Sequence, residues 1–293
     1  FQRTPMTSSV APNFVAVGHV TRDLQGGEPT WRPGGSVSYA ASTAARLGRH
    51  AAVVTSCENS LSLEGFFTGN VQVSRTDAKA TTTFRNETLV DGGRKQFVSG
   101  KAERLDVGHV PFHWLDTQIL LAAPVLDEVD PTMLGRFRRS LVGAVGQGWF
   151  RRWSGAADTP LGRGDLSAIE AIPPVGAFLT SDEDFEGELS DLAEMLEGLT
   201  PIAVVTHGAA GADLFWNREW LSVPAFRAKE ADPTGAGDVF AAAFLVRLSE
   251  TREPVVAARF ASAAASLSVE ATGPLESTPS SGAIERRIEA GER

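Results

Sequence analysis

Residues 231–245 read ADPTGAGDVFAAAFL, a turn of small residues that runs directly into an apolar helix. Gly235 and Gly237 let backbone N–H groups turn inward where the helix begins, and unpaired donors together with the helix dipole favour an anion there. Asp238 falls in the first helical turn, where the dipole favours an ionised carboxylate. The stretch alone leaves two interpretations open. Thr234 caps an ordinary helix that has a first-turn acid, or Asp238 accepts a hydroxyl proton beside an anion hole.

The rest of the chain alternates short apolar runs with longer helical patterns. The expected strands are residues 14–18, 51–55, 118–122, 140–145, 176–180 and 201–206, and the expected helices are residues 36–47, 183–199, 236–249 and 254–269. This alternation predicts an α/β fold, with a mostly parallel sheet covered on both faces. Ligands of such sheets bind beyond the carboxyl ends of the strands, so the polar residues that follow the strands are expected to converge there.

Residues 71–100 depart from this alternation. They hold the β-rich segments VQVSR, TTTFRNETLV and RKQFV, and the DGG at 91–93 is a hairpin signal. Together with the polar stretch at 24–33, they predict a small β-rich lid. Because no other composition shift divides the chain, we expect a single domain over residues 6–293. Residues 1–5 are interpreted as a protease-site remnant.

The bulk composition excludes several classes of protein. The net charge of −9 argues against a non-specific nucleic-acid binder. Cys57 is the only cysteine, which excludes an intrachain disulfide and a cysteine-based zinc cage and suits a reducing cytoplasm. No apolar run approaches the roughly 20 residues of a membrane span, and the first residues lack a signal-peptide core. The expectation is a cytoplasmic protein with no nucleic-acid or membrane partner.

Common nucleotide and metal motifs are missing. Gly100 and Lys101 are followed by Ala102, so the phosphate-binding sequence GxxxxGK[ST] does not occur. The segment GQGWFR at 146–151 begins like a dinucleotide fingerprint, but its sixth residue is Arg where close packing needs Gly or Ala. The histidines show no ligand spacing: His19, His50, His109, His113 and His207.

Four segments in register carry a family resemblance. DPTGAGD at 232–238 resembles the DTxGAGD signature of the ribokinase-like (PfkB) carbohydrate kinases, and GGSVSYAASTAARLG at 34–48 resembles their GGxxxNxAxxxxxLG element. Gly18 followed by Asp23 resembles the substrate acid after the first strand, and VVTHGAAG at 204–211 resembles the VTxGxxG nucleotide segment. The matches fall in the family's order, so the resemblance implies a ribokinase-like three-layer α/β/α sandwich with a lid.

The resemblance also implies roles for individual residues. Asp238 would be the general base that takes a proton from the acceptor hydroxyl. The implied anion hole consists of the N–H groups of Gly235, Ala236 and Gly237. The implied substrate residues are Asp23, Gly34, Gly35, Tyr39 and Arg151, and the implied nucleotide residues are Thr206, Gly208, Gly211, Ser262 and Gly273. From the residues alone these positions are equally compatible with loop acids, turn glycines, strand ends and a surface arginine.

The implied cofactors are ATP and Mg²⁺. TSDE at 180–183 resembles the family's NxxE element, in which Glu183 would position magnesium through water; the alternative is an ordinary acid at a helix N-terminus. Many relatives also use a monovalent cation such as K⁺ near the position of Asp232. Phosphoryl transfer depends on positioning and charge neutralisation, and direct in-line transfer without a phosphoenzyme is implied.

Two departures from the family pattern bear on the substrate. Tyr39, the only tyrosine, stands where the family has Asn, and Thr180 stands where the NxxE element begins. Arg151 ends a segment similar to the QGxxR element of one branch of the family. Together with the compact lid, these features resemble the inositol-kinase-like branch most, which makes myo-inositol the leading single acceptor.

Three functions stay open at this point. The first is an ATP-dependent kinase of a small sugar or cyclic polyol. The second is a nucleoside kinase of the same family, in which Tyr39 or Trp31 stacks on a base. The third is a non-catalytic ligand-sensing protein on the kinase fold, against which the intact GAGD argues. The lid of such kinases often pairs in dimers, which leaves a homodimer through the lid open.

Overall fold

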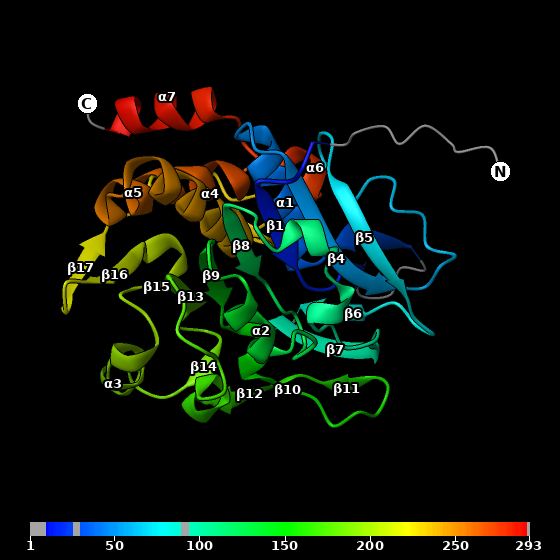
Figure 1. The fold of residues 1–293 in the computed structure, drawn as a ribbon. Helices are drawn as coiled ribbons and strands as arrows, with labels where there is room; N and C mark the ends of the chain where they lie inside the picture. Colours follow the sequence, from blue (N-terminus) through cyan, green and yellow to red (C-terminus); the bar gives the residue numbers. More distant parts are fainter. Residues whose placement is uncertain (1–9, 26–29, 89–93, 292–293) are drawn as a thin grey trace.

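The computed structural model of the protein describes residues 10–25, 30–88 and 94–291, and a nine-stranded sheet runs through its centre (Figure 1). In sheet order the strands are β17 (Glu219–Val223), β16 (Ala212–Trp216), β15 (Ile202–Thr206), β13 (Ala177–Ser181), β9 (Leu141–Val145), β8 (Ile119–Ala122), β1 (Phe14–Val17), β4 (Ala51–Cys57) and β5 (Gln72–Asp77). Neighbouring strands from β15 to β5 are parallel, and β16 and β17 form an antiparallel hairpin at one edge. The predicted mostly parallel sheet is confirmed.

The central strands are buried on both faces, which is why they read as continuous apolar runs. In β1, Phe14 and Ala16 belong to one core cluster, whereas Val15 and Val17 belong to the cluster on the opposite face. All four side chains are fully buried. Because successive side chains of a strand point to opposite faces, β1 contributes to a separate hydrophobic core on each face of the sheet.

Four helices cover one face of the sheet: α1 (Ser36–Arg46), α4 (Ala236–Thr251), α5 (Pro254–Ser268) and, outside them, α7 (Ser281–Gly291) (Figure 1). Helix α4 is buried without interruption from Val239 to Val246 because it lies between the sheet, α1 and α5. A helix buried on every side needs the apolar and small residues that follow Asp238.

The opposite face carries less regular structure. It is covered by α3 (Leu189–Leu199), the single turn of α2 (Gln147–Phe150) and several 3₁₀ turns. Helix α3 begins six residues later than the predicted start at 183. Residues Phe185–Glu186 instead form the short strand β14, which pairs with β12 (Gly162–Asp165). That three-stranded sheet is completed by β10 (Arg151–Arg152).

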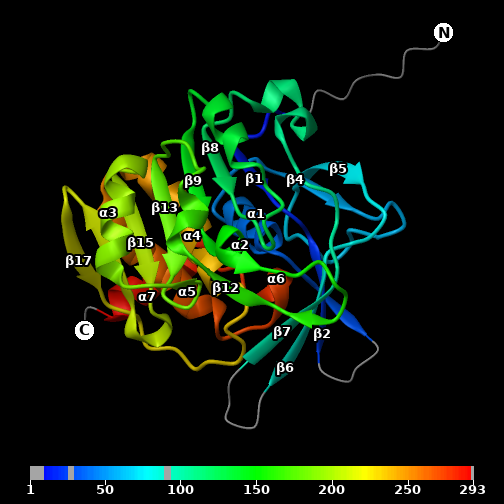
Figure 2. The same ribbon diagram turned by 90° about the horizontal axis from the view of Figure 1, so that it is seen from below.

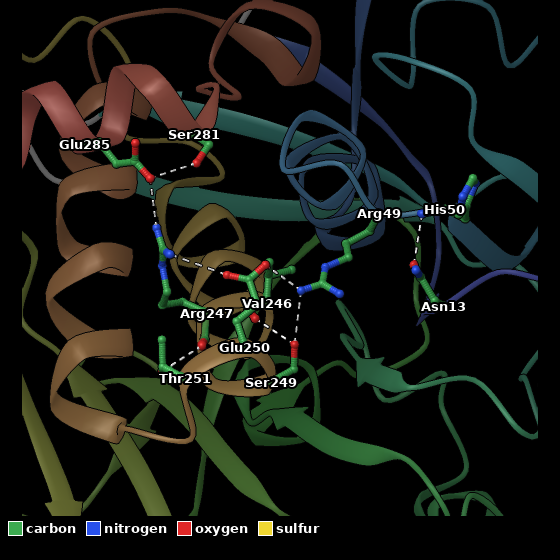
Figure 3. Close-up of polar contacts among 10 residues, drawn as sticks. All are labelled: Asn13, Arg49, His50, Val246, Arg247, Ser249, Glu250, Thr251, Ser281 and Glu285. Atoms are coloured by element: carbon green, nitrogen blue, oxygen red, sulfur yellow. Dashed lines mark hydrogen bonds and ion pairs between the residues drawn. The ribbon is translucent and has the colours of Figure 1, made fainter.

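Polar contacts tie the end of α4 to the amino-terminal edge of the sheet (Figure 3). Arg49, just before β4, donates to Ser249 Oγ at 3.3 Å and to Glu250 Oε1 at 2.6 Å. The neighbouring His50 donates its N–H to Asn13 Oδ1 at 2.9 Å, directly before β1. Because the end of α4 lies at the amino ends of β1 and β4, the start of the helix lies toward the carboxyl ends.

A second sheet of five strands forms the lid, with the order β11 (Thr159–Pro160), β7 (Arg94–Gly100), β6 (Thr83–Thr88), β2 (Thr21–Gln25) and β3 (Trp31–Gly34) (Figure 2). This differs from the predicted lid at 71–100, because β5 pairs with β4 and belongs to the large sheet. The predicted hairpin turn at 91–93 and the remnant at 1–5 lie outside the described residues. No helix in the described ranges is long and apolar enough to cross a membrane.

Candidate active site

Four ionisable side chains from four separate segments interact at the carboxyl edge of the large sheet. Asp238 lies in the first turn of α4, and its electrostatic partners are Arg151, Asp184 and Asp23. Arg151 opens β10, Asp184 directly precedes β14, and Asp23 lies in the lid strand β2. Strand β12 pairs with both β10 and β14, so the small sheet positions Arg151 and Asp184. Helix α4, the small sheet and the lid thus each contribute to one cluster.

The acidity of Asp238 is perturbed within this cluster. Its surface keeps partial solvent access, but dense protein surrounds it, and this burial raises the pKa of Asp238 to about 7. A hydrogen bond from the Ser36 side chain and the charge of Arg151 act in the opposite direction. The expectation that the helix dipole keeps Asp238 fully ionised is therefore wrong near pH 7, because desolvation outweighs the dipole. A carboxyl that is half ionised at neutral pH is well matched to general-base catalysis.

The start of α4 carries backbone donors that have no acceptor among the described residues. In the described part of the chain, the N–H groups of Gly235, Gly237 and Asp238 make no hydrogen bond, whereas Ala236 donates to Pro233 O at 3.2 Å. Gly235 has a φ of 83°, and a Cβ there would lie 2.2 Å from the ring of Tyr39. The glycine therefore fits both the left-handed turn and the packing of this ring. The N–H groups of Gly235 and Gly237 are therefore available for the predicted anion hole. The N–H group of Ala236, by contrast, already donates a hydrogen bond within the turn.

Tyr39 lies in the core rather than in an open pocket. Its side chain is 3% exposed, and its ring packs against Gly235 at the start of α4. This placement supports a packing role for Tyr39 rather than the implied contact with a substrate. The ring supports the turn that holds the free N–H groups in position.

The predicted substrate acid Asp23 is fixed by its neighbours in the lid. Thr21 Oγ1 donates to Asp23 Oδ1 at 2.7 Å. A Cβ on Gly34 would lie 2.3 Å from Asp23 Oδ2, and one on Gly35 would lie 2.3 Å from His19 O. Both glycines are therefore explained by the close approach of β3 and the start of α1 to β2.

Arg151 links the cluster to the lid. Its Nη1 donates to Val125 O at 2.8 Å, and its guanidinium lies 5.5 Å from the centre of the Phe84 ring on β6. Burial lowers the pKa of Arg151, and the carboxylates of Asp184 and Asp238 oppose this shift. Arg151 is thus a partly buried cation near acids and an aromatic ring rather than a fully exposed surface arginine.

The acid that belongs to this cluster is Asp184, and not its neighbour Glu183, which was the predicted magnesium residue. Glu183 is exposed, whereas Asp184 accepts from Ser181 N at 2.8 Å and from Thr180 Oγ1 at 3.1 Å. Burial raises the pKa of Asp184, and these hydrogen bonds and Arg151 act against the rise. The spacing from Ser181 to Asp184 repeats the predicted spacing one residue later, and this signal was overlooked. Ser36 was also missed, and no sequence pattern marks it.

The predicted nucleotide residues lie on several different elements. Thr206 ends β15, Gly208 and Gly211 bound the following turn, Ser262 lies in α5 and Gly273 opens α6 (Gly273–Glu276). Ser262 donates to Pro224 O at 2.9 Å, and Ser181 Oγ donates to Thr206 O at 3.3 Å. The second bond links the end of β15 to the Asp184 turn. Ser262 and Gly273 have no described contact with the four ionisable residues.

His207 lies between two carboxylates in the same segment. Its Nδ1 is 2.7 Å from Asp182 Oδ2 and its Nε2 is 3.2 Å from Asp213 Oδ2. Although burial acts to lower it, these two hydrogen bonds raise the pKa of His207. The contacts hold β13, β15 and β16 together at the carboxyl edge.

The residues present fit magnesium bound partly through water. Within the described ranges, no group of three or more His, Cys, Asp or Glu side chains is arranged to bind a metal directly. Mg²⁺ prefers oxygen ligands, keeps several waters and commonly uses one or two carboxylates together with substrate phosphates. Asp184 and Asp238 supply two such carboxylates beside the free N–H groups of α4.

Comparison with known proteins supports the resemblance to one family. The family model described as pfkB family carbohydrate kinase matches residues 177–281, a range that includes the Asp184 turn, the 206–211 segment and the start of α4. Over this range the chain resembles the ribokinase-like pfkB family. The resemblance and the α/β ribokinase-like fold that the sequence predicted are confirmed.

Individual relatives match over different lengths of this chain. It is 38% identical to a ribokinase of Bacillus subtilis over 84 residues, which is 29% of this chain and 29% of that enzyme's length. It is 24% identical to a cytidine kinase of Thermococcus kodakarensis over 254 residues, which is 82% of this chain and 90% of the relative. A solved pyrophosphate-dependent kinase of the ribokinase family, complexed with a pyrophosphate analog and myo-inositol, superposes with a TM-score of 0.76 at 21% identity and covers 94% of this chain and 99% of its own.

Proposed function

We propose that the protein transfers the γ-phosphoryl group of ATP to a hydroxyl of a small sugar or cyclic polyol, with myo-inositol as the leading acceptor. The observation that carries this proposal is the position of Asp238. A carboxyl with a pKa of about 7 lies one residue after Gly237, beside backbone N–H groups that have no described acceptor. A base next to an anion site is the minimum that phosphoryl transfer to a hydroxyl requires.

The proposed reaction uses these groups in a single step. Asp238 takes the proton of the acceptor hydroxyl, whose oxygen attacks the γ-phosphorus while the bond to the bridging oxygen of ADP breaks. The N–H groups of Gly235 and Gly237 donate to the charge that develops on the transferred group. Asp23, which lies on the lid and acts electrostatically on Asp238, would hold the acceptor through its hydroxyls.

Magnesium would lie on the side of the cluster that contains Asp184. Asp184, rather than the exposed Glu183, would hold the ion through water together with the phosphates. When bound, Mg²⁺ neutralises phosphate charge. Arg151 contributes a fixed positive charge between Asp184 and Asp238, which keeps the pKa of Asp238 from rising further.

A nucleoside kinase is the second candidate, because the cytidine kinase match spans 82% of this chain. The burial of Tyr39 leaves Trp31 as the aromatic residue for base stacking. Trp31 is 38% exposed on β3, with the Phe66 ring 5.9 Å from its own. An exposed ring at the lid edge is a weaker argument for a nucleoside than the Asp23 carboxylate is for a polyol.

The deciding experiment is a matrix of donors and acceptors with Mg²⁺ present. The acceptors are myo-inositol, ribose, fructose, adenosine and cytidine, and the donors are ATP and pyrophosphate, the latter because a structural neighbour is pyrophosphate-dependent. Turnover of a sugar or polyol with ATP supports the proposal. Turnover of a nucleoside alone supports the second candidate. Turnover with pyrophosphate but not with ATP contradicts the proposal that ATP is the donor.

Ligand binding without any turnover would indicate a sensing protein and overturn the proposed reaction. Calorimetry with each acceptor detects this outcome.

A further inference from the structure

Two buried ionisable residues that the proposed reaction does not use are joined by a hydrogen bond. His19 follows β1, Glu128 follows β8, and both residues are fully buried. The carboxylate of Glu128 accepts the N–H of His19 at 2.9 Å, and it also accepts the N–H groups of Val125 and Leu126 at 2.7–3.0 Å. Because polar groups are costly to bury, a buried network with this many bonds calls for an explanation.

The ring of His19 bonds to two further segments of the chain. Its Nε2 lies 2.8 Å from Glu103 O, and its Nδ1 lies 2.7 Å from Thr82 Oγ1. Because a carbonyl oxygen only accepts, Nε2 carries a hydrogen and donates to Glu103 O. Burial lowers the pKa of His19 against the opposing charge of Glu128, so the ring is neutral and Nδ1 accepts from the Thr82 hydroxyl. Thr82 Oγ1 in turn accepts the N–H of Ala102 at 3.0 Å.

These contacts lie where the chain passes between the large sheet and the lid. Residues 18–20 connect β1 to the lid strand β2, residues 78–82 connect β5 to the lid strand β6, and the chain after β7 returns through Glu103 to the large sheet. His19 belongs to the first connection, Thr82 to the second and Glu103 to the third. One imidazole therefore holds three connections of the lid together.

The same network continues to the catalytic cluster. Val125, whose N–H donates to Glu128, accepts from Arg151 Nη1 at 2.8 Å through its carbonyl oxygen. On the lid, Asp23 pairs in register with Phe84, and the ring centre of Phe84 lies 5.5 Å from the guanidinium of Arg151. The lid connections and the catalytic cluster are therefore parts of one contiguous network.

We propose that His19 is a positioning residue: its ring and its N–H group hold the lid connections against the loop of Glu128 and so fix how the lid lies over Asp238. This inference rests on the proposed function, in which the lid brings the acceptor hydroxyl to the base and keeps water away from the transferred group. His19 acts through its contacts rather than on the reactants themselves. Because a misplacement of about 1 Å can cost roughly a hundredfold in rate, contacts outside the site can control the reaction.

The test compares His19→Leu with the wild type, using ATP with myo-inositol and with ribose as probes. Leu fills most of the space of the ring but forms neither hydrogen bond. We expect the acceptor KM to rise roughly tenfold or more and the donor KM to stay within twofold. The amount of ADP released per phosphorylated acceptor should also rise, because water reaches the γ-phosphorus when the lid is misplaced.

Thr82→Val tests whether the two side chains act through one contact. Val has the shape of Thr without the hydroxyl, and it should also raise the acceptor KM. In the double variant the rise should be smaller than the product of the two single effects, because both changes remove the same link. Effects that multiply in full would show that His19 and Thr82 act independently, and they would overturn the inference.

His19→Gln keeps the test falsifiable if the Leu variant folds poorly. Its side-chain amide retains a donor for Glu103 O and loses the ring nitrogen that accepts from Thr82. The acceptor KM of His19→Gln should therefore lie between the values of the wild type and of His19→Leu. A value equal to that of the wild type in both His19→Gln and Thr82→Val would overturn the inference.

Thr200→Val is the matched control for lost stability. Thr200 is 5% exposed, and its Oγ1 donates to Ile202 O at 2.8 Å, where β15 begins at the amino edge of the large sheet. This change also removes a buried hydrogen bond, so the thermal midpoint should fall as it does in Thr82→Val. Both KM values should stay at those of the wild type, because the contact lies at the opposite edge from Asp238.

A lower thermal midpoint in His19→Leu, with an unchanged acceptor KM and an unchanged amount of ADP per product, would show that His19 is only structural and would overturn the inference. In that case wild-type turnover leaves the proposed function intact. A wild-type protein that neither phosphorylates nor shows a thermal shift with either probe would instead overturn the proposed function and the inference with it.

Discussion

The start of α4 and the lid contribute to the same site in different ways. The α4 turn offers mainly backbone N–H groups and one carboxyl, held by a helix that is buried from Val239 to Val246. The lid offers side chains on a small sheet, among them Asp23, which acts electrostatically on Asp238. Under the proposed function, this difference would place the chemistry on a helix held by the core and acceptor binding on the lid.

Changing Gly235 should have the largest effect, because it alters the rigid region itself. In Gly235→Ala the new Cβ would overlap the Tyr39 ring and strain the left-handed turn. We expect kcat/KM to fall by about a hundredfold or more, since the anion hole is displaced. Steady-state kinetics and thermal unfolding measure the two consequences.

Gly48→Ala is the matched control for this change. Gly48 has a φ of 81°, close to the 83° of Gly235, but a Cβ there meets nothing within 4 Å. It should cost about 1 kcal/mol of stability from the backbone strain and no activity. Equal behaviour of the two variants would show that the Tyr39 contact does not hold the catalytic turn.

The second prediction separates the two neighbouring acids Asp184 and Glu183. Asp184→Asn should lower kcat roughly tenfold to a hundredfold and raise the Mg²⁺ concentration needed for half-maximal activity, because the carboxylate in the cluster is lost. Glu183→Gln should stay within twofold, since its side chain is exposed. The reverse order would restore the assignment made from sequence, with Glu183 as the magnesium residue.

The third prediction concerns the pH dependence of Asp238. The base acts only when ionised, so kcat/KM should fall as the pH drops through about 7, the raised pKa of Asp238. Because the charge of Arg151 lowers that pKa, Arg151→Met should move the midpoint of the acid limb to higher pH. The neighbouring exposed arginine provides a control, and Arg152→Met should leave the midpoint in place. A midpoint that is the same in all three proteins would mean that Arg151 does not act on the base.

Much of the fold could be predicted because its elements are long or continuously apolar. Strands β1, β4 and β15 and helices α1 and α4 lie within about two residues of their expected bounds. The start of α3 was wrong because the acids at 182–184 look like helix N-terminal residues, whereas Asp184 instead closes a turn through Ser181 N. Strand β5 was assigned to the lid because an edge strand and a lid strand show the same alternation.

The site was less predictable than the fold because burial is not a local property of sequence. The acid pair Glu183 and Asp184 differs only in which carboxyl faces inward. Ser36 follows two glycines and resembles any helix start, yet its hydroxyl bonds to Asp238. The raised pKa of Asp238 results from surrounding segments that lie far away in sequence, which a local argument from the helix dipole could not include.

The central claim is that Asp238 is the base of a phosphoryl transfer, and the most direct measurement is the turnover of Asp238→Asn on the acceptor that the wild type phosphorylates. Asp191→Asn is the control, because Asp191 is an exposed acid in the first turn of another helix, α3. We expect the Asp238 variant to lose at least about a hundredfold in kcat while folding normally, and the Asp191 variant to match the wild type. Near-wild-type turnover in Asp238→Asn would contradict the account.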